Sequence, residues 1–149
     1  SKIGNLIVMY NLHQDKLLIA SHNEGKISEF RELLGLLKID ILSSKELKLP
    51  EPVEDGQTFE ENALIKAKSA SDLSNLISLS DDSGIEIDAL DKQPGIYSAR
   101  WAGPNRDFDF AMREVTRLLD EKKIPIAERT ARFVCALCLF YTNCEYHFF

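Results

Sequence analysis

The chain has 149 residues, of which 18 are Lys or Arg and 24 are Asp or Glu, giving a formal net charge of −6. Its 44% hydrophobic and 28% charged residues, with seven glycines and five prolines, are typical of one globular domain and exclude disordered and fibrous proteins. The acidic balance argues against a broad nucleic-acid-binding face, and no window approaches the roughly 20 apolar residues of a membrane helix. We therefore expect a cytoplasmic protein with neither nucleic acid nor a membrane as a partner.

The beginning of the chain predicts a strand, a polar loop and a helix. Residues 1–15 are interpreted as an N-terminal extension, and residues 16–149 as one domain. A strand over residues 16–20 is expected to lead through the polar segment 21–26 into a helix. The buried stripe of that helix has the spacing of one helical face and comprises Ile27, Phe30, Leu33, Leu34 and Leu37.

The next segment predicts a short strand and a longer helix. Residues 39–42 are expected to form the strand, and residues 48–56 an acidic loop with two prolines. Thr58 is followed three residues later by Glu61, which is the spacing of a capping box. This pattern predicts a helix over residues 59–75.

The middle of the chain predicts a hairpin or a bent ribbon. Residues 76–79 and 85–90 are expected to form two strands, and the polar run 80–84 is expected to turn between them. Residues 93–105 show no clear periodicity and are expected to be irregular.

The last third predicts a helix and a strand. Asp107 is expected to cap a helix whose buried stripe comprises Phe108, Ala111, Val115, Leu118 and Leu119. Residues 129–141 are expected to form the last and longest strand, which is apolar on both faces and therefore central in its sheet. The order of the elements predicts a mixed α/β fold.

A candidate phosphate-binding loop joins the first strand to the first helix, and it comprises Ser21, His22, Asn23, Glu24, Gly25 and Lys26. Unpaired backbone N–H groups and the helix dipole favour an anion at such a helix start. Lys26 adds a positive charge. The segment is not a Walker A loop, because Ala20 stands at the first glycine position and Ile27 follows the lysine. An ordinary polar loop remains the alternative.

Acidic residues supply candidate ligands for a divalent cation. Asp81 and Asp82 follow an apolar strand, while Glu54 and Asp55 lie in the acidic loop. Neighbouring strand residues face opposite ways, so only one of the two aspartates is expected to enter a given pocket. Mg²⁺ needs only one or two carboxylates when substrate phosphates and water complete its shell. The alternative is that both aspartates only shape a turn.

Two other features have simpler interpretations. Lys66 lies four residues after Asn62 on the predicted helix and shares its face, yet alone it is typical of a solvated lysine. Cys135, Cys138 and Cys144, with His147, would suggest zinc. However, residues three apart on a strand point to opposite sides, so we favour buried free thiols.

Four segments in this order resemble the inosine triphosphate pyrophosphatase family, also called Ham1-like. They read ASHNEGKISEF (20–30), EDGQTFEENALIKAKSA (54–70), DDSGIEIDAL (81–90) and PGIYSARWAG (94–103). The resemblance implies a long, twisted mixed sheet with helices packed around a substrate cleft, in a homodimer. It also implies Mg²⁺-dependent cleavage of non-canonical purine nucleoside triphosphates (ITP, dITP and XTP) to the monophosphate and pyrophosphate.

The resemblance assigns roles by motif position. Residues 21–26 would hold the triphosphate, Lys66 would bind phosphate, and Ser83 would touch the substrate. Glu54 would be a metal ligand, and Asp82 would bind Mg²⁺ and act as the general base.

The chain departs from the family pattern at its end. The glycine-rich and Ser-His-Arg segments with which family members read the purine base do not occur in it. We therefore expect a domain lacking its C-terminal segment and hydrolysing ITP poorly. One alternative is a nucleotide-binding remnant without catalysis, and the other is a Maf-like nucleotide pyrophosphatase.

Overall fold

The computed structural model describes residues 16–149, so the predicted N-terminal extension lies outside the described residues. These residues form two compact units. The first comprises residues 16–56, 60–81 and 137–149, and the second comprises residues 57–59 and 82–136. Two long strands, β3 (Ser78–Ile87) and β5 (Ala131–Phe140), contribute residues to both units.

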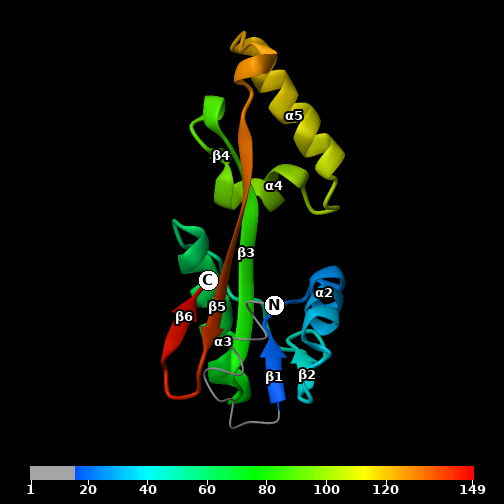
Figure 1. The fold of residues 1–149 in the computed structure, drawn as a ribbon, viewed down its shortest axis with the longest axis vertical. Helices are drawn as coiled ribbons and strands as arrows, with labels where there is room; N and C mark the ends of the chain where they lie inside the picture. The colour runs from blue at the N-terminus through cyan, green and yellow to red at the C-terminus, as the bar shows by residue number, and fades with distance from the viewer. Residues whose placement is uncertain (1–15) are drawn as a thin grey trace. The chain divides into compact units, whose positions relative to one another are not determined.

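The sheet of the first unit is mixed. Strand β1 (Lys16–Ile19) pairs in parallel with β2 (Asp40–Ser43) and with β3, and the first two lie side by side in Figure 1. Strand β6 (Tyr146–Phe148) pairs antiparallel with β5. The strand order is β2-β1-β3-β5-β6. The prediction of a mixed α/β fold is therefore confirmed.

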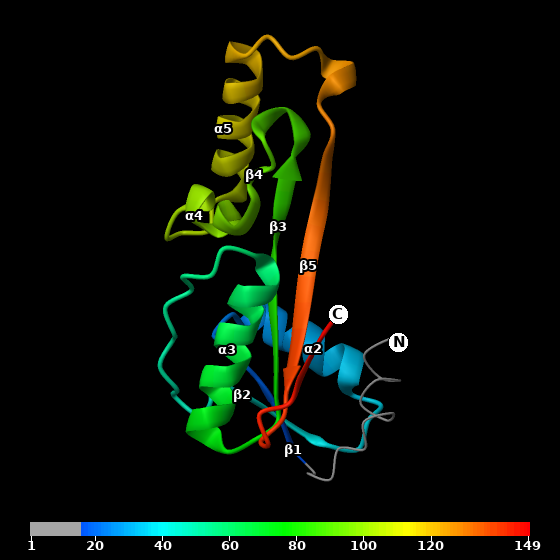
Figure 2. The same ribbon diagram turned by 90° about the vertical axis from the view of Figure 1, so that its left-hand side faces the viewer.

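Two helices of the first unit cover opposite faces of these strands, as Figure 2 shows. Helix α2 (Glu24–Leu34) packs Ile27, Phe30 and Leu34 against the odd-numbered side chains of β1. Helix α3 (Phe59–Ser74) places Ala70 against the even-numbered side chains of the same strand. The alternation of side chains along β1 thus builds a core on each side of the sheet.

The second unit continues from β3 through short elements into a long helix. After β3 come η1 (Asp88–Leu90), β4 (Gln93–Pro94), η2 (Gly95–Tyr97), α4 (Ser98–Ala102), α5 (Phe108–Glu121) and η3 (Ile126–Glu128). Val115 and Leu119 of α5 pack against Ile87 and Leu90 to form the core of this unit. The predicted cap is confirmed, because the Asp107 side chain accepts a hydrogen bond from the Phe110 N–H at 2.9 Å.

Of the hairpin and the bent ribbon predicted for residues 76–90, the hairpin is wrong, because β3 is one continuous strand across the polar run. Its polar side chains have partners elsewhere in the chain: Ser80 donates to the Ala63 carbonyl, and Asp81 pairs with Lys26. Gly84 is needed for a close approach instead of a turn, since a Cβ there would lie 2.4 Å from the Gly95 carbonyl oxygen. Satisfied polar groups can remain in a buried strand.

Smaller predictions are also corrected. Helix α2 begins at Glu24, so the end of the polar loop is its first turn. Leu33 and Phe108, both assigned to buried stripes, are exposed. Residues 93–105 contain β4, η2 and α4, and β6 follows the strand expected to be last.

The predicted central position of the last strand is confirmed by the strand order, in which β5 lies between β3 and β6. It is not buried along its whole length, because the side chains of residues 131–133 are exposed. β5 is also no longer than β3, since each has ten residues. None of the helices within residues 16–149 is long and apolar enough to cross a membrane.

Candidate active site

The polar segment after β1 forms the capped start of α2. Asn23 is the N-cap, and its side-chain oxygen accepts hydrogen bonds from the N–H groups of Gly25 (2.9 Å) and Lys26 (3.4 Å). The Asn23 N–H in turn donates to the Ser21 hydroxyl oxygen at 3.1 Å. The expectation of unpaired N–H groups is therefore wrong for Gly25 and Lys26. Positive charge at this helix start comes from the Lys26 side chain and from the helix dipole.

Lys26 reaches across to the end of the first unit's portion of β3. Its Nζ lies 2.7 Å from Asp81 Oδ2. The Asp81 side chain is 9% exposed and that of Lys26 is 33% exposed. A buried carboxylate therefore orients an ammonium group that water can still reach.

His22 connects the polar segment 21–26 to the acidic loop at residues 48–56. Its Nε2 lies 2.7 Å from the Leu49 carbonyl oxygen, and because a carbonyl can only accept, this nitrogen carries the proton. Its Nδ1 lies 3.5 Å from Glu51 Oε1. Glu24, the next predicted substrate ligand, is exposed and forms a hydrogen bond with Lys45, which lowers the pKa of the Glu24 carboxyl. The polar contacts of His22 are thus with the acidic loop, and that of Glu24 is with Lys45.

The acidic loop meets α3 through two polar contacts. Lys66 Nζ lies 2.9 Å from Glu54 Oε1, and the Gly56 N–H donates to Asn62 Oδ1 at 2.8 Å. Asn62 is buried, and the Lys66 side chain is 18% exposed. The prediction that these two residues share a helix face is confirmed, because both contact the same loop. Lys66 is largely buried in this ion pair, unlike an ordinary solvated lysine.

The remaining predicted site residues belong to the second unit. Asp82 follows Asp81 on β3 and is half-buried, and Ser83 is exposed. Thus the structure brings Lys26 together with Asp81 and Lys66 with Glu54 inside the first unit.

The candidate metal ligands, Glu54 and Asp82, supply carboxylate oxygens, which are the donors that Mg²⁺ prefers. Within residues 16–149 there is no group of three or more His, Cys, Asp or Glu side chains placed to hold a metal ion. This donor set fits a cation that takes most of its ligands from substrate phosphates and water. Burial raises the pKa of the Cys138 thiol to about 12, so Cys138 stays protonated at neutral pH.

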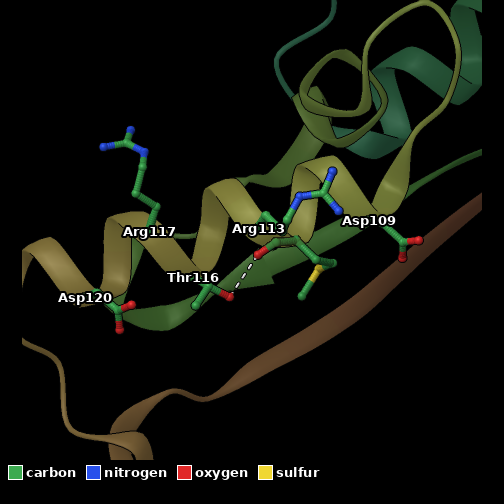
Figure 3. Close-up of a pocket in the computed structure, with 6 residues that line it drawn as sticks. Asp109, Arg113, Thr116, Arg117 and Asp120 are labelled. Carbon is green, nitrogen blue, oxygen red and sulfur yellow. Dashed lines mark hydrogen bonds between the residues drawn. The ribbon is translucent and has the colours of Figure 1, made fainter.

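A shallow hollow of about 560 Å³ lies along α5 in the second unit, and Figure 3 shows the side chains that line it. Its lining contains both acids and arginines, and Arg117 forms ion pairs with Glu114 and Glu121 on the same helix. These carboxylates raise the pKa of the Arg117 guanidinium above its usual value. None of the predicted site residues lines this hollow, and we do not assign it to the candidate site.

Two contacts were missed by sequence reasoning. The sequence motifs assign a role to Asp82 and none to Asp81, although Asp81 is the partner of Lys26. Asn62 was noted only for its helix face, although it holds the acidic loop. A signal existed for Asn62 in its spacing from Lys66, whereas the Lys26–Asp81 pair joins residues 55 positions apart.

The chain is similar in sequence to proteins of known name. A "dITP/XTP pyrophosphatase" from Zymomonas mobilis is 51% identical over 86% of this chain and 61% of its own length. One of the same name from Brucella melitensis is 47% identical over 95% of this chain and 66% of its own. The chain thus spans about three fifths to two thirds of the length of these relatives.

A solved structure of a related protein is also similar to this fold. A solved HAM1 protein from Coxiella burnetii has a TM-score of 0.80 at 36% identity, covering 89% of this chain and 68% of that one. The model of the Ham1 family matches residues 17–149. The chain therefore belongs to the Ham1 family.

Proposed function

We propose that the protein hydrolyses non-canonical purine nucleoside triphosphates such as ITP, dITP and XTP, in a Mg²⁺-dependent reaction that yields the nucleoside monophosphate and pyrophosphate. The observation that carries this proposal is the pair of lysines in the first unit, Lys26 and Lys66, each oriented by a carboxylate. The similarity to dITP/XTP pyrophosphatases supports the choice of substrate.

The lysines have the chemistry needed for the phosphates. A triphosphate carries several negative charges, and hydrolysis between its α- and β-phosphates transfers charge to the leaving pyrophosphate. Ammonium groups placed beside these oxygens stabilise that charge more in the transition state than in the ground state. Ser21 and Asn23, at the capped start of α2, place Lys26 at the positive end of the helix.

Asp82 is proposed as the general base. Its carboxylate takes a proton from the attacking water while the oxygen of that water bonds to the α-phosphorus, and the bond to the bridging oxygen breaks. Ser83, exposed next to it, is proposed to touch the substrate. Glu54 and Asp82 would hold Mg²⁺, which supplies charge neutralisation at the phosphates when bound.

Two further parts of the proposal rest on the family resemblance. We propose that the protein is a homodimer and that it works in the cytoplasm on the nucleotide pool. Light scattering of the purified protein tests the first, and fractionation of the source cells tests the second.

The experiment for the main proposal is an assay of ITP with Mg²⁺, in which inosine monophosphate and pyrophosphate are separated and quantified. We expect both products in equal amounts, and we expect Asp82→Asn to slow their formation strongly. Asp72→Asn, which changes an exposed acid on the outer face of α3, is the matched control. Binding of ITP without any product would favour the non-catalytic alternative. Faster turnover of dTTP or UTP than of ITP would favour the Maf-like alternative.

A further inference from the structure

Asp81 is a buried acid for which the proposed reaction has no role. It lies on β3, is 7% exposed as a residue, and accepts a hydrogen bond from Lys26 Nζ at 2.7 Å. The two residues come from different elements, since Lys26 is in the first turn of α2. Burying a carboxylate is costly unless it is paired, and the contact with Lys26 offsets part of that cost.

The pairing restricts a side chain that is otherwise flexible. A lysine has four rotatable bonds and loses conformational freedom whenever its ammonium group is fixed. A carboxylate on a strand in the middle of the sheet provides that fixation before any ligand arrives. The ammonium group has three protons, and the contact with Asp81 uses one of them. Two protons remain for the oxygens of a ligand, and the Lys26 side chain is one third exposed.

Lys66, the second lysine of the first unit, differs from Lys26 in how firmly its acidic partner is held. Glu54, the partner of Lys66, is 44% exposed and lies in a loop, so it can turn away when another anion approaches Lys66. Asp81 is on a strand and its side chain is 9% exposed, which leaves it little room to move. The Lys26–Asp81 contact is therefore the one that persists when an anion binds.

We propose that Asp81 is a positioning residue that fixes the Lys26 ammonium group for contact with the phosphate oxygens of the substrate; this inference rests on the proposed function. A positioning role for Asp81 and simple electrostatics predict opposite changes in anion affinity when the Asp81 charge is removed. Removing a negative charge near an anion site should strengthen anion binding if Asp81 only competes with the ligand. Removing a positioning group should weaken binding, because Lys26 must then be ordered by the ligand itself.

The experiment measures binding of inorganic tripolyphosphate with Mg²⁺ by calorimetry in a double-mutant cycle. We expect Asp81→Asn and Lys26→Ala each to weaken binding about tenfold or more, the scale of one hydrogen bond to a charged group. We expect the double variant to be no weaker than Lys26→Ala, because Asp81 acts only through Lys26. Asp81→Glu should recover part of the affinity, and Asp72→Asn, which breaks the exposed Lys68–Asp72 pair, should leave it unchanged.

Other results would overturn the inference. Tighter or unchanged tripolyphosphate binding by Asp81→Asn would show a competing or idle carboxylate, and additive effects in the double variant would show that Asp81 acts independently of Lys26. The rate at which an amine-reactive reagent labels Lys26, followed by mass spectrometry, gives a readout that needs no ligand. We expect faster labelling of Lys26 in Asp81→Asn than in the unchanged protein. The melting temperature of the variant is measured in parallel. An unchanged labelling rate would contradict the fixation of Lys26. A protein that passes these tests but does not hydrolyse ITP would refute the proposed function and leave the inference standing.

Discussion

The two lysine–carboxylate pairs of the first unit differ in how firmly their acids are held. At the start of α2, Lys26 meets an aspartate that is buried on β3, whereas Lys66 on α3 meets a half-exposed glutamate from the loop before it. The distances are nearly equal, at 2.7 and 2.9 Å, so the difference lies in the surroundings of the acid and not in the contact. One pair is suited to stay intact when a phosphate binds, and the other is suited to exchange its partner. The lysines of both pairs bind phosphates in the proposed reaction, and neither pair supplies the general base.

The largest effect is expected from the proposed general base. Asp82→Asn should lower the turnover of ITP by about 10² to 10⁴, the scale of losing a general acid or base. Its neighbour provides the matched control, because Asp81→Asn should act on the Michaelis constant more than on turnover. Steady-state kinetics of the two variants separate the roles. If Asp81→Asn proves to be the more damaging change to turnover, the assignment of the base is reversed.

Removing Lys66, whose acidic partner can be exchanged for a phosphate, is expected to have the next largest effect. Lys66→Ala should weaken the binding of ITP and of GTP alike, by about tenfold or more, since a phosphate contact carries no information on the base. Binding of both nucleotides is measured by calorimetry. A changed preference between ITP and GTP at unchanged overall affinity would place Lys66 beside the base instead.

Substitutions at two glycines compare how tightly the acidic loop and the start of α2 are packed. A Cβ on Gly56 would lie 2.7 Å from Asn62 Oδ1 and 2.8 Å from the Glu61 Cβ, whereas one on Gly25 would meet only Asn23 Oδ1, at 3.2 Å. Gly56→Ala should lower the free energy of unfolding by about 1–3 kcal/mol, the usual cost of overpacking. Gly25→Ala should be close to neutral, because alanine favours the helix that begins there. Urea denaturation compares them, and an equal loss in both would contradict the difference in packing.

The smallest effect is expected at the cap of α2. Asn23→Ala removes the acceptor for the Gly25 and Lys26 N–H groups and should lower the free energy of unfolding by about 1 kcal/mol. Asn23→Ser keeps a capping oxygen and serves as the control, with an expected loss of a few tenths of a kcal/mol. Both are measured by the same urea titration. No loss in Asn23→Ala would show that this cap does not stabilise the helix.

Local signals in the sequence predicted several elements well. The helix predicted over residues 59–75 is observed at Phe59–Ser74, and the cap at Asp107 is observed as predicted. Both depend on residues a few positions apart in the chain. Three of the five residues assigned to the stripe of α2 are buried, because the 3.6-residue period places them on the side that packs on the sheet.

Non-local contacts explain what was not predicted. The polar run at residues 80–84 resembles a turn, yet it continues as a strand because Ser80 and Asp81 find partners on α3 and α2. The same holds for the candidate site. Its residues were identified from motif positions, but the pairing of Lys26 with Asp81 depends on a parallel strand order that no local pattern contains.

In the proposed reaction, water attacks the α-phosphorus of a purine triphosphate. The direct test is hydrolysis of ITP with Mg²⁺ in water labelled with the heavy oxygen isotope, followed by mass spectrometry of the products. We expect the label in inosine monophosphate and none in the pyrophosphate. Label in the pyrophosphate, or release of orthophosphate and inosine diphosphate, would contradict it.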